Sequence, residues 1–219
     1  KSDFSATFGI EDRVTNRSRR ALELLGNDPA ISRDELLRYR SDTRYHPESD
    51  MMKMVVELVT TPSKDPEVGA AQEILRNWDG DTVRTSRGAA LAVITGTRAR
   101  GYEINEPEMP PIEALRLTMD ELMATFGRLD PEWGEVNRLQ RGTQSLPLDG
   151  GPDILRAIYS DRDGVGKVGT INAFAGDTHI MVADWDADGN LRLDSIHNYG
   201  SATLDENSPH YSDQTQMYA

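Results

Sequence analysis

The sequence predicts an α+β fold, in which a helical lobe is followed by antiparallel strands. The first observation is the period of the apolar residues, which recur every three or four positions as far as residue 127. The second is a change after Trp133-Gly134, where glycine, proline and alternating β-forming residues become common. Together they predict a mainly helical segment over residues 1–130 and a mainly β segment over residues 131–219, with the change falling between residues 128 and 150.

The composition limits the classes of protein to which the chain can belong. Its 219 residues can bury roughly 70% of the surface that the unfolded chain exposes, which is enough for a core. The net charge of −13 argues against nucleic acid as a partner, because phosphate binding needs clustered Lys and Arg. No run approaches the ~20 apolar residues of a membrane helix, so no membrane span is expected. Cysteine is absent, which excludes a disulfide and a cysteine nucleophile within these residues.

Start and stop signals indicate about six helices before residue 130. Ser32 with Glu35 three residues later is a capping box, and Asp65-Pro66 places a cap before a proline at the first helical position. Gly26 and Gly127 are typical stops. We expect an amphipathic first helix and a largely buried third one. The ranges predicted to be helical are 12–25, 32–39, 51–59, 66–78, 89–97 and 115–126.

The second half of the chain contains three predicted strands, over 168–173, 179–185 and 191–196, with Asp186-Ala187-Asp188-Gly189 as a hairpin turn between the last two. Asp184, Asp186 and Asp188 also match the opening of an EF-hand loop. The twelfth position of that loop is Ser195, however, where calcium binding needs a bidentate glutamate. An acidic hairpin tip that faces solvent explains the same residues, and we favour it over a calcium loop.

The polar residues offer two further candidate sites, one for zinc and one for acyl transfer. Zinc is not indicated, because neither an H-x-x-x-H spacing nor a cysteine accompanies His46, His179, His197 and His210. Ser201, His210 and Asp213 have the residue types of an acyl-transfer triad, but Gly200-Ser201 lacks the G-x-S-x-G elbow. We therefore interpret these residues as structural.

Four groups of residues carry a family resemblance through their order and spacing. The first contains Asp3, Phe4, Gly9, Asp12-Arg13-Val14-Thr15 and Leu24-Leu25; the second contains Trp78-Asp79-Gly80, Ser86 and the small apolar run 88–94. The third covers 133–138 and 147–151, and the fourth, the most specific, is Gly200-Ser201 followed by Pro209-His210-Tyr211-Ser212-Asp213-Gln214. Together they resemble the β chain of the penicillin acylases, a family of N-terminal-nucleophile hydrolases.

The resemblance implies a fold and a site residue. The fold would be a fragment of the αββα N-terminal-nucleophile hydrolase fold, in which residues 131–219 complete the acylase sheet and end in a short helix. Arg13 would contact substrate and organise the oxyanion-stabilising groups. The family's nucleophile is the amino-terminal Ser, Cys or Thr of the mature β chain. Because this chain begins with Lys1, we expect the nucleophile to lie outside it. The resemblance implies a structural role for the motif around His210.

The implied function is that of the C-terminal part of an acylase that hydrolyses linear amides, as in β-lactam antibiotics, N-acyl-homoserine lactones or lipopeptides. No cofactor is required for this chemistry. Asp3, allowing one residue of slippage, matches a calcium ligand of the family, so structural calcium in the intact enzyme is expected.

The expected partners are the rest of the acylase, meaning the α chain and the N-terminal part of the β chain, and an acylated small molecule. Self-association of the isolated chain and a periplasmic or secreted location are also expected. The alternative is a non-catalytic structural or protein-interaction module on an acylase scaffold.

Overall fold

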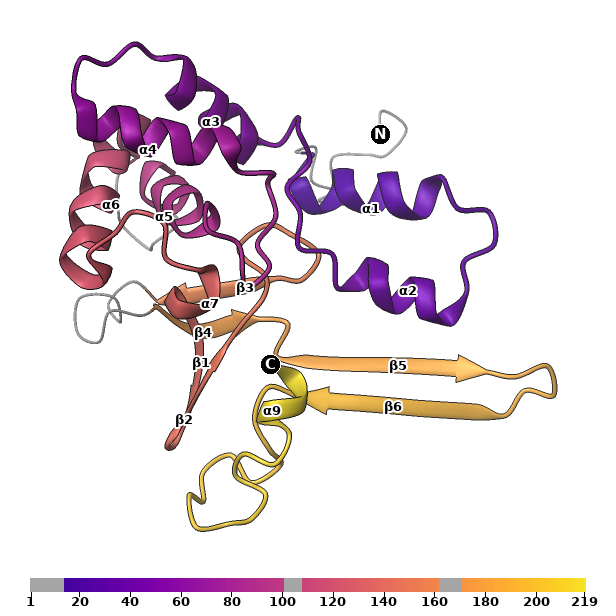
Figure 1. Cartoon of the computed structure of the whole chain (residues 1–219). Coiled ribbons are helices and arrows are strands. Elements are labelled where there is room, and N and C mark those ends of the chain that lie inside the picture. The colour runs from indigo at the N-terminus through magenta and orange to yellow at the C-terminus, as the bar shows by residue number, and fades with distance from the viewer. Residues whose placement is uncertain (1–13, 101–107, 162–170) are drawn as a thin grey trace, which may run out of the picture.

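The computed structural model describes residues 14–100, 108–161 and 171–219. Figure 1 shows a helical lobe formed by α3, α4, α5 and α6, with α1 and α2 beside it and strands below, and the long β5–β6 hairpin extends away from the lobe. This mixture of helices and strands confirms the predicted α+β class, whereas the αββα arrangement stays a prediction. No helix among the described residues is long and apolar enough to cross a membrane.

The pair of helices beside the lobe is α1 (Asn16–Gly26) and α2 (Arg33–Arg40). The Thr15 side chain caps α1 by accepting the Ser18 N–H, and the predicted start at Asp12 lies outside the described residues. The apolar face expected on α1 is exposed rather than packed, with Leu22 71% exposed. The capping box predicted for α2 is confirmed.

The helical lobe consists of α3 (Asp50–Thr60), α4 (Pro66–Asn77), α5 (Ala89–Ala99) and α6 (Pro111–Phe126). Small residues let α5 lie at the centre, with every side chain from residue 89 to 96 buried. A Cβ on Gly96 would lie 2.6 Å from the Met51 Cε, so the glycine leaves room for the end of this methionine side chain. The prediction that α3 is largely buried was too broad, since Val56 faces solvent and is 56% exposed.

After the short helix α7 (Trp133–Val136), four strands form one sheet in the order β2-β1-β4-β3. Their bounds are β1 (Asn137–Arg141), β2 (Gln144–Pro147), β3 (Ile158–Asp161) and β4 (Ile171–Gly176). The pairs β1–β2 and β3–β4 are antiparallel, but β1 and β4 are parallel, with Asn137 opposite Ile171. The prediction of antiparallel strands was wrong for this pair, because the long connection between them permits the crossover that parallel strands require.

A second sheet consists of the hairpin β5 (His179–Trp185) and β6 (Leu191–His197), which confirms the two strands predicted there. At its tip the Asp186 carboxylate accepts the N–H of Asp188 at 3.0 Å and of Asn190 at 2.8 Å. Gly189 has a φ of 82°, a left-handed conformation that suits glycine. The final helix is α9 (Thr215–Tyr218), which packs beside β6.

The apolar core has two parts. The larger fills the helical lobe and includes Trp133, and the smaller lies under the sheet around Leu139, Leu148, Ile158 and Tyr218. Ile180 and Ile196 of the hairpin pack against the smaller core. The boundary predicted between residues 130 and 131 stays a prediction, although the helices α1 to α6 precede it and the strands follow.

Candidate functional site

The two site residues expected from the resemblance, Arg13 and Asp3, lie outside the described residues. The nearest described part of the chain is the start of α1, and the first turn of this helix contributes side chains to a polar network. Asn16 is 3% exposed although asparagine is mostly a surface residue. Its burial indicates that this side chain has a specific structural task.

Both the nitrogen and the oxygen of the Asn16 side-chain amide form hydrogen bonds. Its Nδ2 donates to the Arg44 carbonyl at 3.2 Å and to the Asp153 carbonyl at 2.8 Å, while its Oδ1 accepts the His46 N–H at 2.7 Å. Its backbone N–H donates to the Asp153 carboxylate at 3.0 Å. A buried amide with every group paired fixes its surroundings, because leaving one group unpaired costs about 1–3 kcal/mol. The start of α1 is thereby joined to two segments that are distant in sequence.

Arg17 adds a second attachment one residue later. Its Nε donates to the Ile154 carbonyl at 3.2 Å and its Nη2 to the Tyr159 hydroxyl of β3 at 3.4 Å. Asp153 has a φ of 58°, which is unusual for a residue other than glycine. We call Asn16 and Arg17 with Asp153 and Ile154 the α1 anchor. It fixes the point at which the chain leaves the segment containing Arg13.

Below the anchor, Arg20 of α1 holds Asp42 with two short hydrogen bonds, 2.8 Å from Nε and 2.6 Å from Nη2. Both side chains are 11% exposed, so the pair is well shielded. The hydrogen bond to Asp42 raises the pKa of Arg20 above its usual value. The Asp42 carbonyl also accepts the Arg156 N–H at 2.9 Å. Asp42 therefore links α1 to the segment that precedes β3.

A second charged cluster surrounds α9. The buried Arg156 donates to the Tyr218 carbonyl at 3.0 Å, and its guanidinium lies 4.4 Å from the centre of the Tyr218 ring. Asp177 pairs with Arg40 at 2.9 Å and lies 3.7 Å from Arg156. Burial lowers the pKa of Arg40 and raises the pKa of Tyr218.

Arg84 pairs with Asp149 at 2.7 Å and also donates to the Ala219 carbonyl. These contacts hold the end of the chain against the sheet.

The motif around His210 forms a cluster of hydrogen-bonded residues, which we call the C-terminal knot and which contains Gly200, His210, Asp213 and Gln214. His210 Nδ1 lies 2.8 Å from an Asp213 oxygen, and the Gln214 side chain accepts the His197 N–H at 2.8 Å. A Cβ on Gly200 would lie 1.9 Å from the His210 carbonyl oxygen, so only glycine fits. Among the described residues, no hydrogen bond joins Ser201 to His210. The geometry is that of a strand end, a loop and a helix held by polar contacts, as the structural interpretation expected.

Three of the four aspartates of the hairpin, Asp184, Asp186 and Asp194, accept hydrogen bonds within the protein. Arg33 of α2 donates to Asp184 and to Asp194, both at 2.8 Å. Asp186 accepts the turn hydrogen bonds, and those from Asn190 lower its pKa. No group of three or more His, Asp or Glu side chains that could hold a metal occurs within the described ranges. These contacts support the hairpin reading of Asp184, Asp186 and Asp188.

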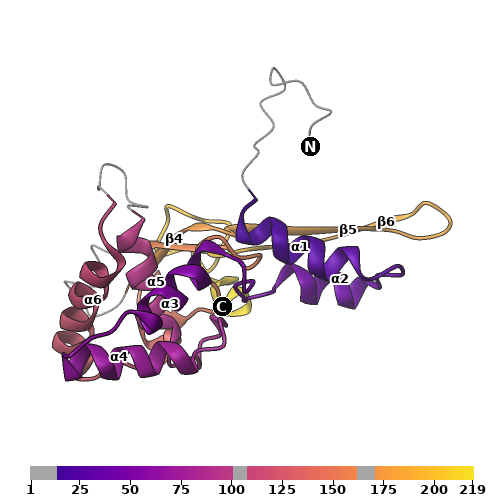
Figure 2. The same ribbon diagram turned by 90° about the horizontal axis from the view of Figure 1, so that it is seen from above.

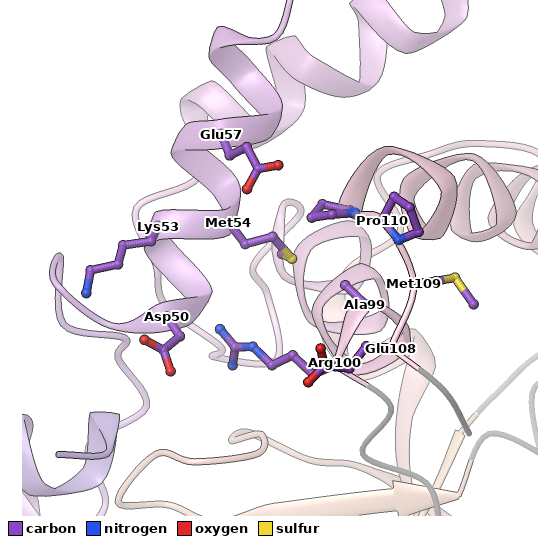
Figure 3. Close-up of a pocket in the computed structure, with 10 residues that line it drawn as sticks. Asp50, Lys53, Met54, Glu57, Ala99, Arg100, Glu108, Met109 and Pro110 are labelled. Atoms are coloured by element: carbon purple, nitrogen blue, oxygen red, sulfur yellow. The ribbon is translucent and has the colours of Figure 1, made fainter. Parts of the chain in front are cut away.

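Two cavities border the helical lobe. Figure 3 shows the first, of about 700 Å³, between α3 and the ends of α5 and α6; Met54 projects toward it, and Arg100 extends toward Asp50. The second, of about 680 Å³, lies beside Trp78 and the start of α5. Neither set of lining residues contains a histidine, so neither combines a serine, a histidine and a carboxylate. Among their described lining residues, both cavities therefore lack a Ser-His-carboxylate triad.

Sequence reasoning missed the α1 anchor and the Arg156 cluster. Asn16 follows the capping Thr15, where a polar residue is ordinary, and Asp153 lies in a glycine- and proline-rich loop that predicts only a turn. No local pattern shows that these residues meet. The pairing depends on the contact between segments more than 130 residues apart.

The comparison with protein families agrees with the motifs. The sequence matches the Penicillin amidase family over residues 2–219. The match spans nearly the whole chain and includes Asp3 and Arg13. No curated protein matches the chain. Because the family match covers far more than half of the residues, the chain belongs to the penicillin amidase family, a family of amide hydrolases in the N-terminal-nucleophile superfamily.

Proposed function

We propose that this chain is the C-terminal part of an acylase that hydrolyses a linear amide between an acyl group and a polar core. β-Lactams, N-acyl-homoserine lactones and lipopeptides are substrates of this class. The catalytic nucleophile is an amino-terminal Ser, Cys or Thr that lies outside the chain. The family membership supports the reaction class, and the motifs around residues 3–25 support the position of this chain within the β chain.

In the proposed reaction the nucleophile attacks the amide carbonyl carbon, and its own α-amino group takes the proton. The amine leaves with a proton, and water then hydrolyses the acyl-enzyme to release the acid. Each tetrahedral intermediate carries an oxyanion, which fixed donors stabilise. Arg13 has the role of holding substrate and organising those donors. In the intact enzyme Asp3 contributes to a structural calcium site.

The α1 anchor is the observation that carries the role of Arg13. The described chain begins at Val14 and is held in place from Asn16 onward. Asn16 makes four hydrogen bonds to segments distant in sequence, and Arg17 makes two more. An arginine that organises an oxyanion site needs such a fixed base, because a misplacement of about 1 Å can cost a large part of the rate.

The first test is the intact mass and N-terminal sequence of the protein produced from the full-length gene. We expect two chains, the larger beginning with Ser, Cys or Thr and containing these 219 residues. A single unprocessed chain without amidase turnover would contradict the proposal. It would favour the alternative, a non-catalytic module that has kept the acylase scaffold.

The second test concerns Arg13 in the same full-length protein. Arg13→Ala is expected to lower kcat/KM for an acylated amide by about 10²–10³-fold, the usual effect of losing an oxyanion-site group. The matched control is Arg19→Ala on the same helix, where an exposed pair with Glu48 at 2.9 Å is lost without a change in rate. Full activity of Arg13→Ala would show that Arg13 is only a surface charge.

A further inference from the structure

Two histidines that are distant in the sequence lie side by side at the base of the β5–β6 hairpin. His179 is the first residue of β5, and His197, the last residue of β6, lies directly opposite it. The two imidazole rings stack, with their centroids 4.4 Å apart and their planes 5° apart. Both residues are exposed, and the hairpin extends well beyond the helical lobe in both views (Figure 2). Solvent therefore reaches the pair in this chain.

The hydrogen-bond pattern of the hairpin explains why the two rings are so close. In an antiparallel pair of strands, opposed residues that exchange backbone hydrogen bonds alternate with opposed residues that do not, and side chains lie closer at the latter. The Asn198 N–H donates to the Thr178 carbonyl at 3.1 Å. His179 and His197 are the next pair along the hairpin, so they form a non-hydrogen-bonded pair. The Cβ atoms of such a pair lie about 4.5–5.5 Å apart, close enough for both side chains to reach one ligand.

The ring nitrogens of this pair have no other described partner. Within the part of the chain that the structure describes, no hydrogen bond or ion pair joins either ring to a further residue. The other two histidines differ in this respect. His46 Nδ1 accepts a backbone N–H at 3.0 Å, and His210 Nδ1 lies 2.8 Å from a carboxylate oxygen. Because a neutral imidazole keeps one nitrogen lone pair, His179 and His197 offer two lone pairs at one place on the surface.

We propose that His179 and His197 together bind one late transition-metal ion. Imidazole nitrogen suits copper, nickel and zinc, and among the divalent ions of this series the affinity is highest for Cu²⁺. Metal–nitrogen bonds of about 2.0–2.1 Å put two nitrogens that share one ion roughly 3 Å apart. The ring centroids are 4.4 Å apart, so rotation of these two exposed side chains brings their nitrogens to that separation. Water occupies the remaining positions around the ion.

This site goes beyond the proposed function and does not depend on it. Calcium takes oxygen ligands, so the histidine pair belongs to a different metal class from the calcium expected at Asp3. A metal bound by the first residue of β5 and the last residue of β6 joins the two strands at the open end of the hairpin. A two-stranded hairpin is marginally stable on its own. A metal that binds only the folded hairpin therefore stabilises it.

The test adds Cu²⁺ to the protein produced from the full-length gene, in excess Ca²⁺ so that calcium sites stay filled. Calorimetry counts the bound copper, and electron spin echo modulation counts the imidazoles on it. The wild type should bind one more Cu²⁺ than His179→Gln or His197→Gln, and the double variant should lose no more than either single variant. This additional ion should carry two imidazoles. The matched control is His210→Gln, which removes an exposed histidine outside the hairpin and should leave the copper count unchanged.

Equal copper counts in the wild type and the hairpin variants would overturn the proposal. Loss of the ion in only one of the two variants would also overturn it, because a single histidine would then be the ligand. If a variant fails to fold, amide exchange of the wild type decides. Zn²⁺ at 100 times its Kd should slow exchange within β5 and β6 by up to about a hundredfold, and unchanged exchange would refute the site. Copper binding as expected by a protein without amidase activity would refute the proposed function alone.

Discussion

The helical lobe and the β5–β6 hairpin place their leucines differently. In the lobe, Leu115 and Leu122 of α6 are completely buried, whereas Leu191 and Leu193 of β6 are more than half exposed. Hydrophobicity alone does not decide where a side chain lies. The lobe closes its own core with four helices, while the hairpin has a covering layer on one face only.

The same contrast separates the contacts that hold each region. Apolar packing holds α5 inside the lobe, where the end of the Met51 side chain lies against Gly96. The hairpin is held by the two ion pairs of Arg33, by packing of Ile180 and Ile196, and by contact with α9. Because surface ion pairs contribute about 0–1 kcal/mol each, the hairpin should be the less stable region.

The largest expected effect comes from a leucine deletion in the lobe. Leu115→Ala removes a fully buried side chain, so we expect the free energy of unfolding to fall by about 2–5 kcal/mol. The matched control is Leu193→Ala on the hairpin, which should change it by no more than about 0.5 kcal/mol. Urea unfolding of this chain followed by tryptophan fluorescence measures both. Equal losses in the two variants would show that the hairpin face is buried in solution.

Substitutions of two glycines by alanine should change the free energy of unfolding by smaller amounts and in opposite directions. Gly200→Ala would force a Cβ to within 1.9 Å of the His210 carbonyl oxygen, and we expect a loss of about 1–3 kcal/mol from displaced backbone. Gly69→Ala, in α4 with nothing within 4 Å of the new Cβ, should stabilise the lobe by about 0.5–1 kcal/mol through helix propensity. Thermal unfolding distinguishes them. A neutral Gly200→Ala would show that the C-terminal knot is loosely packed.

Most of the local structure could be predicted from the sequence, because it depends on neighbouring residues. The capping box of Ser32 and Glu35, the stop at Gly127 and the hairpin around Gly189 are set by chemistry within a few positions. The strands β1, β2 and β3 were missed. They are short, and β1 reads Asn-Arg-Leu-Gln-Arg, so its strand state comes from pairing with β2 and β4 rather than from its own propensity.

The candidate site was predictable to a smaller extent. Arg13 and Asp3 came only from the family resemblance, and nothing in their local pattern distinguishes them from surface charges. The α1 anchor depends on Asn16 meeting Asp153, a contact across 137 residues that no local period reports. Exposure was also hard to predict on the hairpin, because alternation shows that one face is apolar but not whether a layer covers it.

The smallest expected effect is a dependence on acid that differs between the two regions. Hydrogen bonds from Arg116 and from the Glu67 N–H lower the pKa of Asp65, the cap of α4, below its usual 3.8. Hydrogen bonds from Asn190 lower the pKa of Asp186 at the hairpin tip in the same way. An acid whose folded-state pKa is lowered contributes stability above its unfolded pKa, and this contribution is lost as the pH falls through the folded value.

Asparagine keeps the capping oxygen of both residues but cannot titrate between pH 5 and pH 2. In a Trp185→Phe background the fluorescence reports only the buried Trp78 and Trp133, which belong to the larger core, and we therefore expect Asp65→Asn to flatten the acid dependence of the urea midpoint. Asp186→Asn should leave that midpoint curve unchanged and flatten only the acid dependence of amide exchange within β5 and β6. If Asp186→Asn altered the tryptophan curve as much as Asp65→Asn, the lobe and the hairpin would unfold as one unit. The difference in stability drawn between them from their contacts would then be wrong.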